Sequence, residues 1–155
     1  MKTINSIDKV NQLTKNDFID IFGNVFEKTY WIADKAYNLK PFNNFNELSS
    51  TIRKIYENSS KEDFLKIFNA HPELAVEQKL TEDSQKEQNN ANLNQCSNEE
   101  FNEFQNLNVK YKKKFGFPFI IAVKGKNKNE TSLEFEEAKK QVKKIADFRL
   151  KEIIN

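Results

Sequence analysis

The chain of 155 residues contains one histidine, His71, which stands directly before a proline in the segment FNAHPELA, residues 68–75. An imidazole has an unperturbed pKa of about 6.5, so it can accept and return a proton near neutral pH. The residue before a proline is pushed out of the helical region by the proline ring, so a preceding helix must end near His71. At a helix end, the helix dipole would also stabilise a histidine that has no catalytic role.

A row of polar residues follows in a helix that is expected to begin after Thr81. The side chains that share one helical face at the spacing i, i+3, i+4, i+7 are Ser84, Glu87, Gln88 and Ala91. An ordinary surface helix carries apolar residues in such a row, so a polar row favours one wall of a cleft. A solvated face in a segment rich in Gln and Asn explains the row equally well.

An arginine continues the apolar row of the last predicted helix. The apolar residues of that row are Phe135, Ala138, Val142 and Ile145, and Arg149 stands where the next one would be. A buried guanidinium without a partner is costly, so the position indicates either a facing carboxylate or an anionic ligand. Near a helix end, a long cationic side chain can instead extend to solvent.

Other kinds of site have less support in the sequence. Cys96 is the only cysteine, which excludes an intramolecular disulfide and a cysteine-based metal site. A dyad of Cys96 with His71 has no local signature, and no carboxylates stand at a recognisable metal-ligand spacing. We therefore expect no metal ion.

Charge and hydropathy limit the partners. The chain has 25 basic and 23 acidic residues and a formal net charge of +2, which does not favour nucleic acid or an anionic membrane. The longest uncharged apolar run, FPFIIAV at 117–123, is too short to span a bilayer, and the N-terminus lacks a signal-peptide apolar segment. We expect a cytoplasmic protein.

Helical periodicity dominates the elements that must position these residues. The chain is 37% hydrophobic with 14 Phe but only three Gly and three Pro, which predicts one all-α domain over residues 1–155. Start signals and apolar spacing predict helices from about 15, around 30–39, around 45–56, from about 61, from 82, from 98 to about 115, and from about 133 to the C-terminus. Pro118 makes 117–123 an extended apolar segment, followed by a solvated loop at 124–130.

Four motifs in order resemble the 2-oxo-4-hydroxy-4-carboxy-5-ureidoimidazoline (OHCU) decarboxylase family: FNAHPELA, LTEDSQKEQNNANL, YKKKFGFPFIIAVKG and KKIADFRL. The N-terminal stretch FGNVFEKTYWIADKAYNLKPFNNFNEL is also similar, and the resemblance covers about residues 13–150. It implies an all-α multi-helix bundle of this type that is usually homodimeric, has no cofactor, and produces (S)-allantoin from OHCU in urate degradation.

The resemblance also implies roles for individual residues. His71 matches the catalytic histidine, Glu87 the catalytic glutamate and Arg149 the arginine of the final Arg-Leu. The expected substrate-binding residues are Pro72, Ser84, Gln88, Phe119 and Ile121. We expect His71 to exchange the proton, Glu87 to orient His71 or bind substrate N–H groups, and Arg149 to pair with a substrate oxygen.

Some positions depart from the family pattern. Val76 stands where a glycine is common, and Ala91-Asn92-Leu93 stands where Ala-Gly-Leu is common. The stretch from His71 to Glu87 is short, and a segment after 124–130 is missing. The alternative function is therefore a catalytically silent relative that binds a small molecule or another protein. Lysine-rich patches in KYKKKFG and KGKNK could contact nucleic acid, but the aromatic residues fall at helical core spacing, so we expect no nucleic acid partner.

Overall fold

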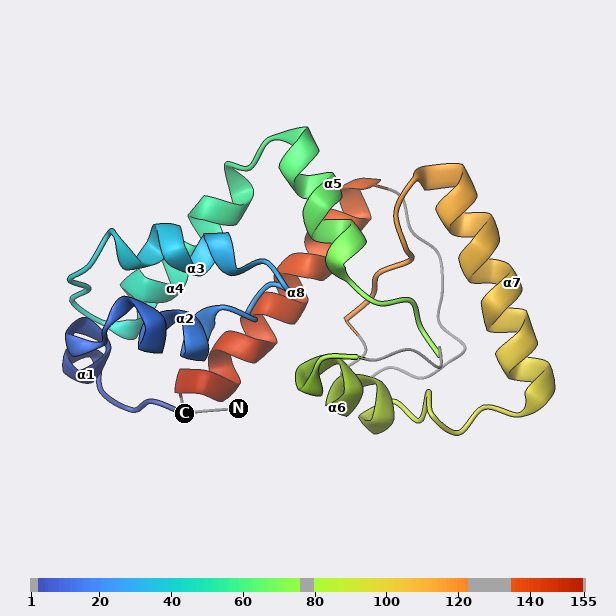
Figure 1. Cartoon of the computed structure of the whole chain (residues 1–155), viewed down its shortest axis with the longest axis horizontal. Helices are drawn as coiled ribbons and strands as arrows, with labels where there is room; N and C mark the ends of the chain where they lie inside the picture. Colours follow the sequence, from blue (N-terminus) through green and yellow to red (C-terminus); the bar gives the residue numbers. More distant parts are fainter. Residues whose placement is uncertain (1–2, 76–79, 123–134, 155) are drawn as a thin grey trace. The chain divides into compact units, whose positions relative to one another are not determined.

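A computed structural model describes residues 3–75, 80–122 and 135–154, and all regular secondary structure in these ranges is α-helical (Figure 1). The helices are α1 (Ile7–Gln12), α2 (Lys15–Phe22), α3 (Tyr30–Tyr37), α4 (Phe45–Glu57), α5 (Lys61–Ala70), α6 (Glu82–Asn90), α7 (Asn98–Phe115) and α8 (Phe135–Ile154). The all-α prediction is confirmed. The predicted start of the last helix near 133 and the loop at 124–130 lie outside the described residues.

Side-chain caps begin the helices where the sequence predicted them. The Thr14 hydroxyl accepts a hydrogen bond from the Asp17 N–H at 3.2 Å and starts α2. At the start of α7, Ser97 and Glu100 each accept a hydrogen bond from the other's backbone N–H, which forms the predicted capping box. Gly116 ends α7 in the left-handed conformation, with φ of 77°.

Two features near the N-terminus differ from the prediction. Helix α1, which Ser6 caps, was not predicted because only one of its residues, Val10, is buried. Helix α2 ends at Phe22, although its apolar row continues through Val25 and Phe26. Both of these residues are 2% exposed, but they lie in the turns between α2 and α3.

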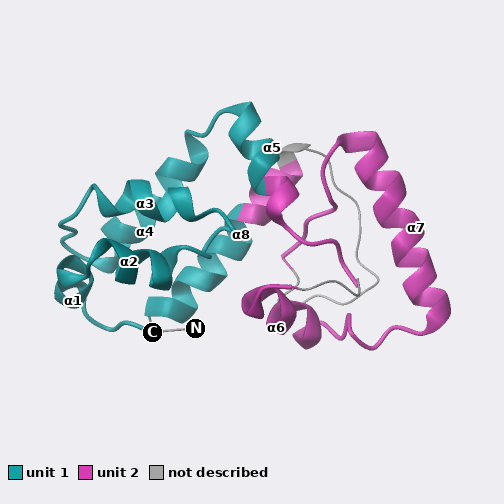
Figure 2. Ribbon diagram, viewed as in Figure 1, with its two compact units in different colours: residues 1–67, 143–155 teal, residues 68–142 magenta. Residues whose placement is uncertain are grey.

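The chain forms two compact units, drawn in different colours in Figure 2. Unit 1 consists of residues 1–67 and 143–155, which are far apart in sequence. Within it, α3 packs against α2 and α4, and the Ile4 N–H donates a hydrogen bond to the Ile153 carbonyl at 2.8 Å. Tyr56 stacks on Phe26 with ring centroids 4.7 Å apart, so the turn after α2 is fixed to the core by aromatic packing.

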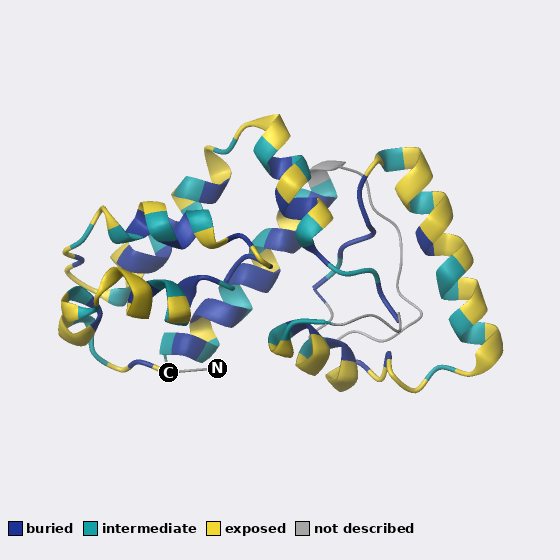
Figure 3. Ribbon diagram, in the orientation of Figure 1, coloured by how far each residue is buried: buried dark blue, intermediate teal, exposed yellow. Residues whose placement is uncertain are grey.

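Unit 2 is the continuous stretch of residues 68–142. Its core contains Leu74, Ala91, Leu93 and Phe119, with Phe104, Tyr111 and Ile121 packed against it. The described part of the predicted extended segment, residues 117–122, is non-helical and mostly buried (Figure 3). The prediction of one domain over residues 1–155 stays a prediction. None of the helices in the described ranges is long and apolar enough to cross a membrane.

Candidate active site

His71 lies immediately after α5, as the proline that follows it predicted. Its backbone N–H donates a hydrogen bond to the Phe68 carbonyl at 3.1 Å, and the residue is only 7% exposed. Pro72 and Glu73 are half-buried and continue the chain away from the helix. The imidazole is therefore attached to a well-packed helix end, away from bulk solvent.

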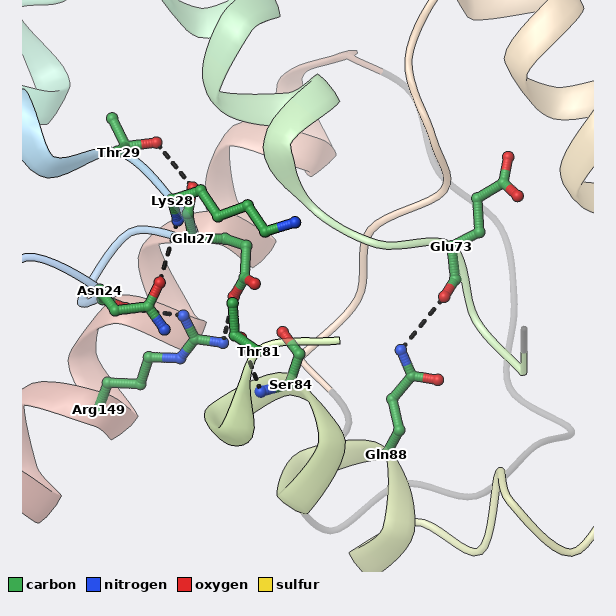
Figure 4. Close-up of polar contacts among 9 residues, drawn as sticks. All are labelled: Asn24, Glu27, Lys28, Thr29, Glu73, Thr81, Ser84, Gln88 and Arg149. Atoms are coloured by element: carbon green, nitrogen blue, oxygen red, sulfur yellow. Dashed lines mark hydrogen bonds and ion pairs between the residues drawn. The ribbon is translucent and has the colours of Figure 1, made fainter. Parts of the chain in front are cut away.

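The polar row of α6 forms the buried face of that helix. Ser84 is 4% exposed, Gln88 is 7% exposed and Glu87 is half-buried, whereas Gln85 and Lys86 between them are exposed. The interpretation of the row as a solvated face is therefore wrong. The helix begins where the Thr81 hydroxyl accepts a hydrogen bond from the Ser84 N–H at 3.3 Å (Figure 4).

Gln88 connects α6 to the segment that follows His71 (Figure 4). Its side-chain oxygen accepts a hydrogen bond from the Ala75 N–H at 3.1 Å, and its amide nitrogen donates to the Glu73 carbonyl at 3.2 Å. The helix that carries Glu87 is thus hydrogen-bonded to the segment that carries His71. The sequence predicted Gln88 as a substrate contact, and this role stays a prediction.

The extended segment 117–122 shares an apolar cluster with Leu74, in the segment that follows His71. Phe119 is 8% exposed and belongs to the apolar cluster with Leu74, and Ile121 packs against this cluster. Tyr111 of α7 meets the Phe119 ring edge to face, with centroids 5.3 Å apart. Seven of the predicted site residues therefore belong to unit 2: His71, Pro72, Ser84, Glu87, Gln88, Phe119 and Ile121.

Arg149, the remaining predicted site residue, belongs to unit 1 and is paired with a carboxylate there. Its Nη2 atom lies 2.9 Å from Oε2 of Glu27, and its Nη1 donates to the Asn24 carbonyl at 2.8 Å (Figure 4). The Arg149 and Glu27 side chains are 2% and 1% exposed. The guanidinium does not extend to solvent, and the sequence argument for a facing carboxylate is confirmed.

The turn that presents Glu27 is itself closely held. A Cβ on Gly23 would overlap the Ile19 carbonyl oxygen, so only glycine fits at the end of α2. Lys28 adopts a left-handed φ of 50°, and its N–H donates to the Asn24 side chain at 3.0 Å. These contacts fix the backbone on both sides of the carboxylate.

Sequence reasoning did not identify Glu27 as the partner of Arg149. A local signal was present, since Glu27 directly follows two apolar residues in the stretch VFEK. A charged residue that continues an apolar run indicates a buried charge, which needs a partner.

Metal-binding groups do not form a cluster in the part of the chain that the structure describes. Within residues 3–75, 80–122 and 135–154, no three side chains of His, Cys, Asp or Glu are placed to share an ion. The Cys96 thiol donates to the Leu93 carbonyl at 3.3 Å.

Comparisons with known proteins agree with the motif resemblance. A family model described as OHCU decarboxylase matches residues 11–151. A 2-oxo-4-hydroxy-4-carboxy-5-ureidoimidazoline decarboxylase of Haloferax volcanii is 35% identical over 159 residues, which cover 95% of this chain and 95% of that protein.

Two further comparisons involve longer proteins. A uric acid degradation bifunctional protein of Bacillus sp. (strain TB-90) is 38% identical over 95% of this chain, which spans only 32% of that protein. The solved structure of an (S)-allantoin synthase is similar with a TM-score of 0.73 and 24% identity. That match covers 98% of this chain and 54% of the other, and it shows a shared fold.

Proposed function

Because the chain belongs to the OHCU decarboxylase family, we propose that it decarboxylates OHCU to (S)-allantoin in urate degradation. One observation carries the proposal furthest. The segment that follows the buried His71 is hydrogen-bonded through Gln88 to α6, the helix that carries the half-buried Glu87. This arrangement supports a proton-exchanging histidine and a glutamate that are both held by a rigid scaffold.

The substrate supplies the electron sink for this reaction. The bond between a ring carbon and its carboxylate breaks, carbon dioxide leaves, and the electron pair moves into the adjoining unsaturated system of the ring. A proton then adds to one face of the ring. The protein must hold the carboxylate out of the ring plane, stabilise the developing charge and deliver the proton from one side.

His71 is the group that we assign to proton exchange. Glu87 orients the imidazole or accepts hydrogen bonds from substrate N–H groups, and Ser84 and Gln88 are proposed contacts on the same face of α6. Pro72, Phe119 and Ile121 form the apolar surroundings of the substrate. The burial of His71 supports this assignment, because a proton donor shielded from bulk water can act on one face of the ring.

Arg149 binds an oxygen of the substrate in this proposal. A guanidinium carries five N–H donors in one plane, which suits the recognition of a carboxylate or carbonyl oxygen. Glu27 and the Asn24 carbonyl fix the orientation of that plane. Arg149 therefore needs little reorganisation when it pairs with the substrate.

The proposed location, oligomeric state, cofactor requirement and partner follow from the family resemblance and the sequence. We propose a cytoplasmic homodimer, with each chain forming one domain over residues 1–155. The reaction as derived needs no cofactor and no metal ion. The partner of the site is the small molecule OHCU.

The test follows (S)-allantoin by circular dichroism while urate oxidase and 5-hydroxyisourate hydrolase convert urate to OHCU. We expect the protein to accelerate the appearance of the (S)-allantoin signal, and His71→Asn to abolish this acceleration. Glu87→Gln should lower the rate by about 100-fold, because the imidazole or the substrate would lose the carboxylate that positions it. Glu82→Gln, which changes an exposed glutamate of the same helix, is the matched control and should keep the rate.

A slow, racemic product in the presence of the unchanged protein would contradict the proposal. It would favour the catalytically silent relative that binds a small molecule. A His71→Asn protein with an unchanged rate would refute the role of the imidazole while leaving the activity in place.

A further inference from the structure

Two side chains that the sequence did not single out reach from α7 to the segment after His71. The Asn108 amide donates a hydrogen bond to the Leu74 carbonyl at 3.0 Å, and the Gln105 amide donates to the Ala75 carbonyl at 3.3 Å. Together with Gln88 of α6, they form a group that we call the amide clamp, defined as Gln88, Gln105 and Asn108.

The burial pattern of α7 shows that Asn108 has a special place on the helix. Asn108 is 4% exposed, whereas its neighbours Leu107 and Val109 are 51% and 64% exposed. Most of the helix is exposed in Figure 3. A helix normally buries its apolar residues and exposes its amides, so a buried amide between two exposed aliphatic residues indicates a requirement for its hydrogen bond.

The backbone that the amide clamp holds has no regular structure of its own. Residues 71–75 lie outside the helices, and Ala75 adopts a left-handed φ of 52°, which is unfavourable for a residue with a Cβ. Such a conformation persists where the surroundings hold it in place. The amide clamp binds four polar groups of this backbone: the carbonyls of residues 73, 74 and 75 and the N–H of Ala75.

We propose that Asn108 and Gln105 are positioning residues that set the place of the His71 imidazole. This inference rests on the proposed function for its effect on the rate. The backbone of His71 is fixed on one side by α5, through its hydrogen bond to Phe68, and the chain that follows it is held at residues 73–75 by the amide clamp. Carboxamides suit this task because they bind backbone carbonyls without adding a charge that would perturb the imidazole.

The test uses Asn108→Leu, which keeps a similar side-chain size but removes the donor to Leu74. Asn106→Leu, at an exposed position of the same helix, is the matched control. Since His71 is the only histidine, its Hε1 proton gives one NMR signal that can be followed through a pH titration. For Asn108→Leu we expect a changed Hε1 chemical shift and titration midpoint, and a kcat lowered by about 10- to 100-fold with a smaller change in KM.

A purely structural role would give a different result. The temperature of unfolding would fall, while the Hε1 signal and kcat, measured below that temperature, would match those of Asn106→Leu. This result would overturn the inference. If Asn108→Leu does not fold, Gln105→Met is used instead, since it removes the donor to Ala75 at a half-buried position. The Hε1 signal and kcat of this variant then test the inference in the same way. If the unchanged protein has no activity, the proposed function fails, but the Hε1 signal still tests the amide clamp.

Discussion

The buried ion pair of Glu27 and Arg149 allows a quantitative prediction for Glu27→Gln. Both side chains are at most 2% exposed and lie 2.9 Å apart. Removing one partner leaves the other charge buried, which costs about 3–5 kcal/mol. A domain of this size has a free energy of unfolding of about 5–15 kcal/mol, so the variant would lose a large part of its stability.

Thermal unfolding followed by far-ultraviolet circular dichroism measures this loss. At about 2–4 °C per kcal/mol for a protein of this length, we expect the unfolding temperature to fall by about 6–20 °C. Asp147→Asn is the matched control, because its pair with Arg53 has an N–O distance of 3.0 Å but both side chains are about one-third exposed. An exposed pair contributes about 0.2–1 kcal/mol, so the control should lose only a few degrees.

A double variant separates the loss of the ion pair itself from the cost of leaving one charge buried without its partner. Replacing both Glu27 and Arg149 by methionine removes both charges together, and we expect it to recover most of the stability that Glu27→Gln loses. Equal, small losses for Glu27→Gln and Asp147→Asn would refute the reasoning, since they would mean that the Arg149 charge remains solvated.

Three further changes test other parts of the fold. Gly23→Ala should destabilise the protein by about 1–3 kcal/mol in urea denaturation, because the added Cβ overlaps the Ile19 carbonyl; a stability equal to that of the unchanged protein would contradict this. Burial, with the nearby Glu57 carboxylate second, raises the pKa of Tyr56. The unfolded chain releases this phenol proton at about pH 10 while the folded chain retains it, so the contribution to stability is complete below that pH and falls by about 1.4 kcal/mol per pH unit above it. Tyr56→Phe should reduce this alkaline slope in unfolding measured across pH, and an unchanged slope would argue against the effect. Ser97→Ala removes the cap of α7 and should cost about 1 kcal/mol in the same denaturation assay; no loss would show that the capping box is dispensable.

Local signals in the sequence were sufficient to predict most helix boundaries. Thr14, Thr81 and Ser97 all cap helices in the structure because a cap depends on residues only three positions apart. The position of His71 at a helix end follows in the same way from the proline beside it. Helix α1 was missed because six residues with one buried side chain give no apolar row.

The partners of the site residues depend on contacts that local patterns do not contain. The position of Arg149 in an apolar row predicted a partner, but the row could not identify Glu27, which lies far away in the sequence. Gln88 was correctly placed on the polar row of α6. Its hydrogen bonds to the backbone of residues 73 and 75 depend on the tertiary fold, as do those of Gln105 and Asn108.

The division of unit 1 between the two ends of the chain has a consequence for synthesis on the ribosome. Residues 68–142 form unit 2 as one continuous stretch, so every part of it has been translated before residues 143–155 emerge. Glu27 is made early, but Arg149 is made 122 residues later (149 − 27), so the nascent carboxylate must remain hydrated until then. We therefore expect unit 2 to complete its core first and the N-terminal helices to finish packing only after residues 143–155 have emerged, which reverses the usual order in which N-terminal parts fold first.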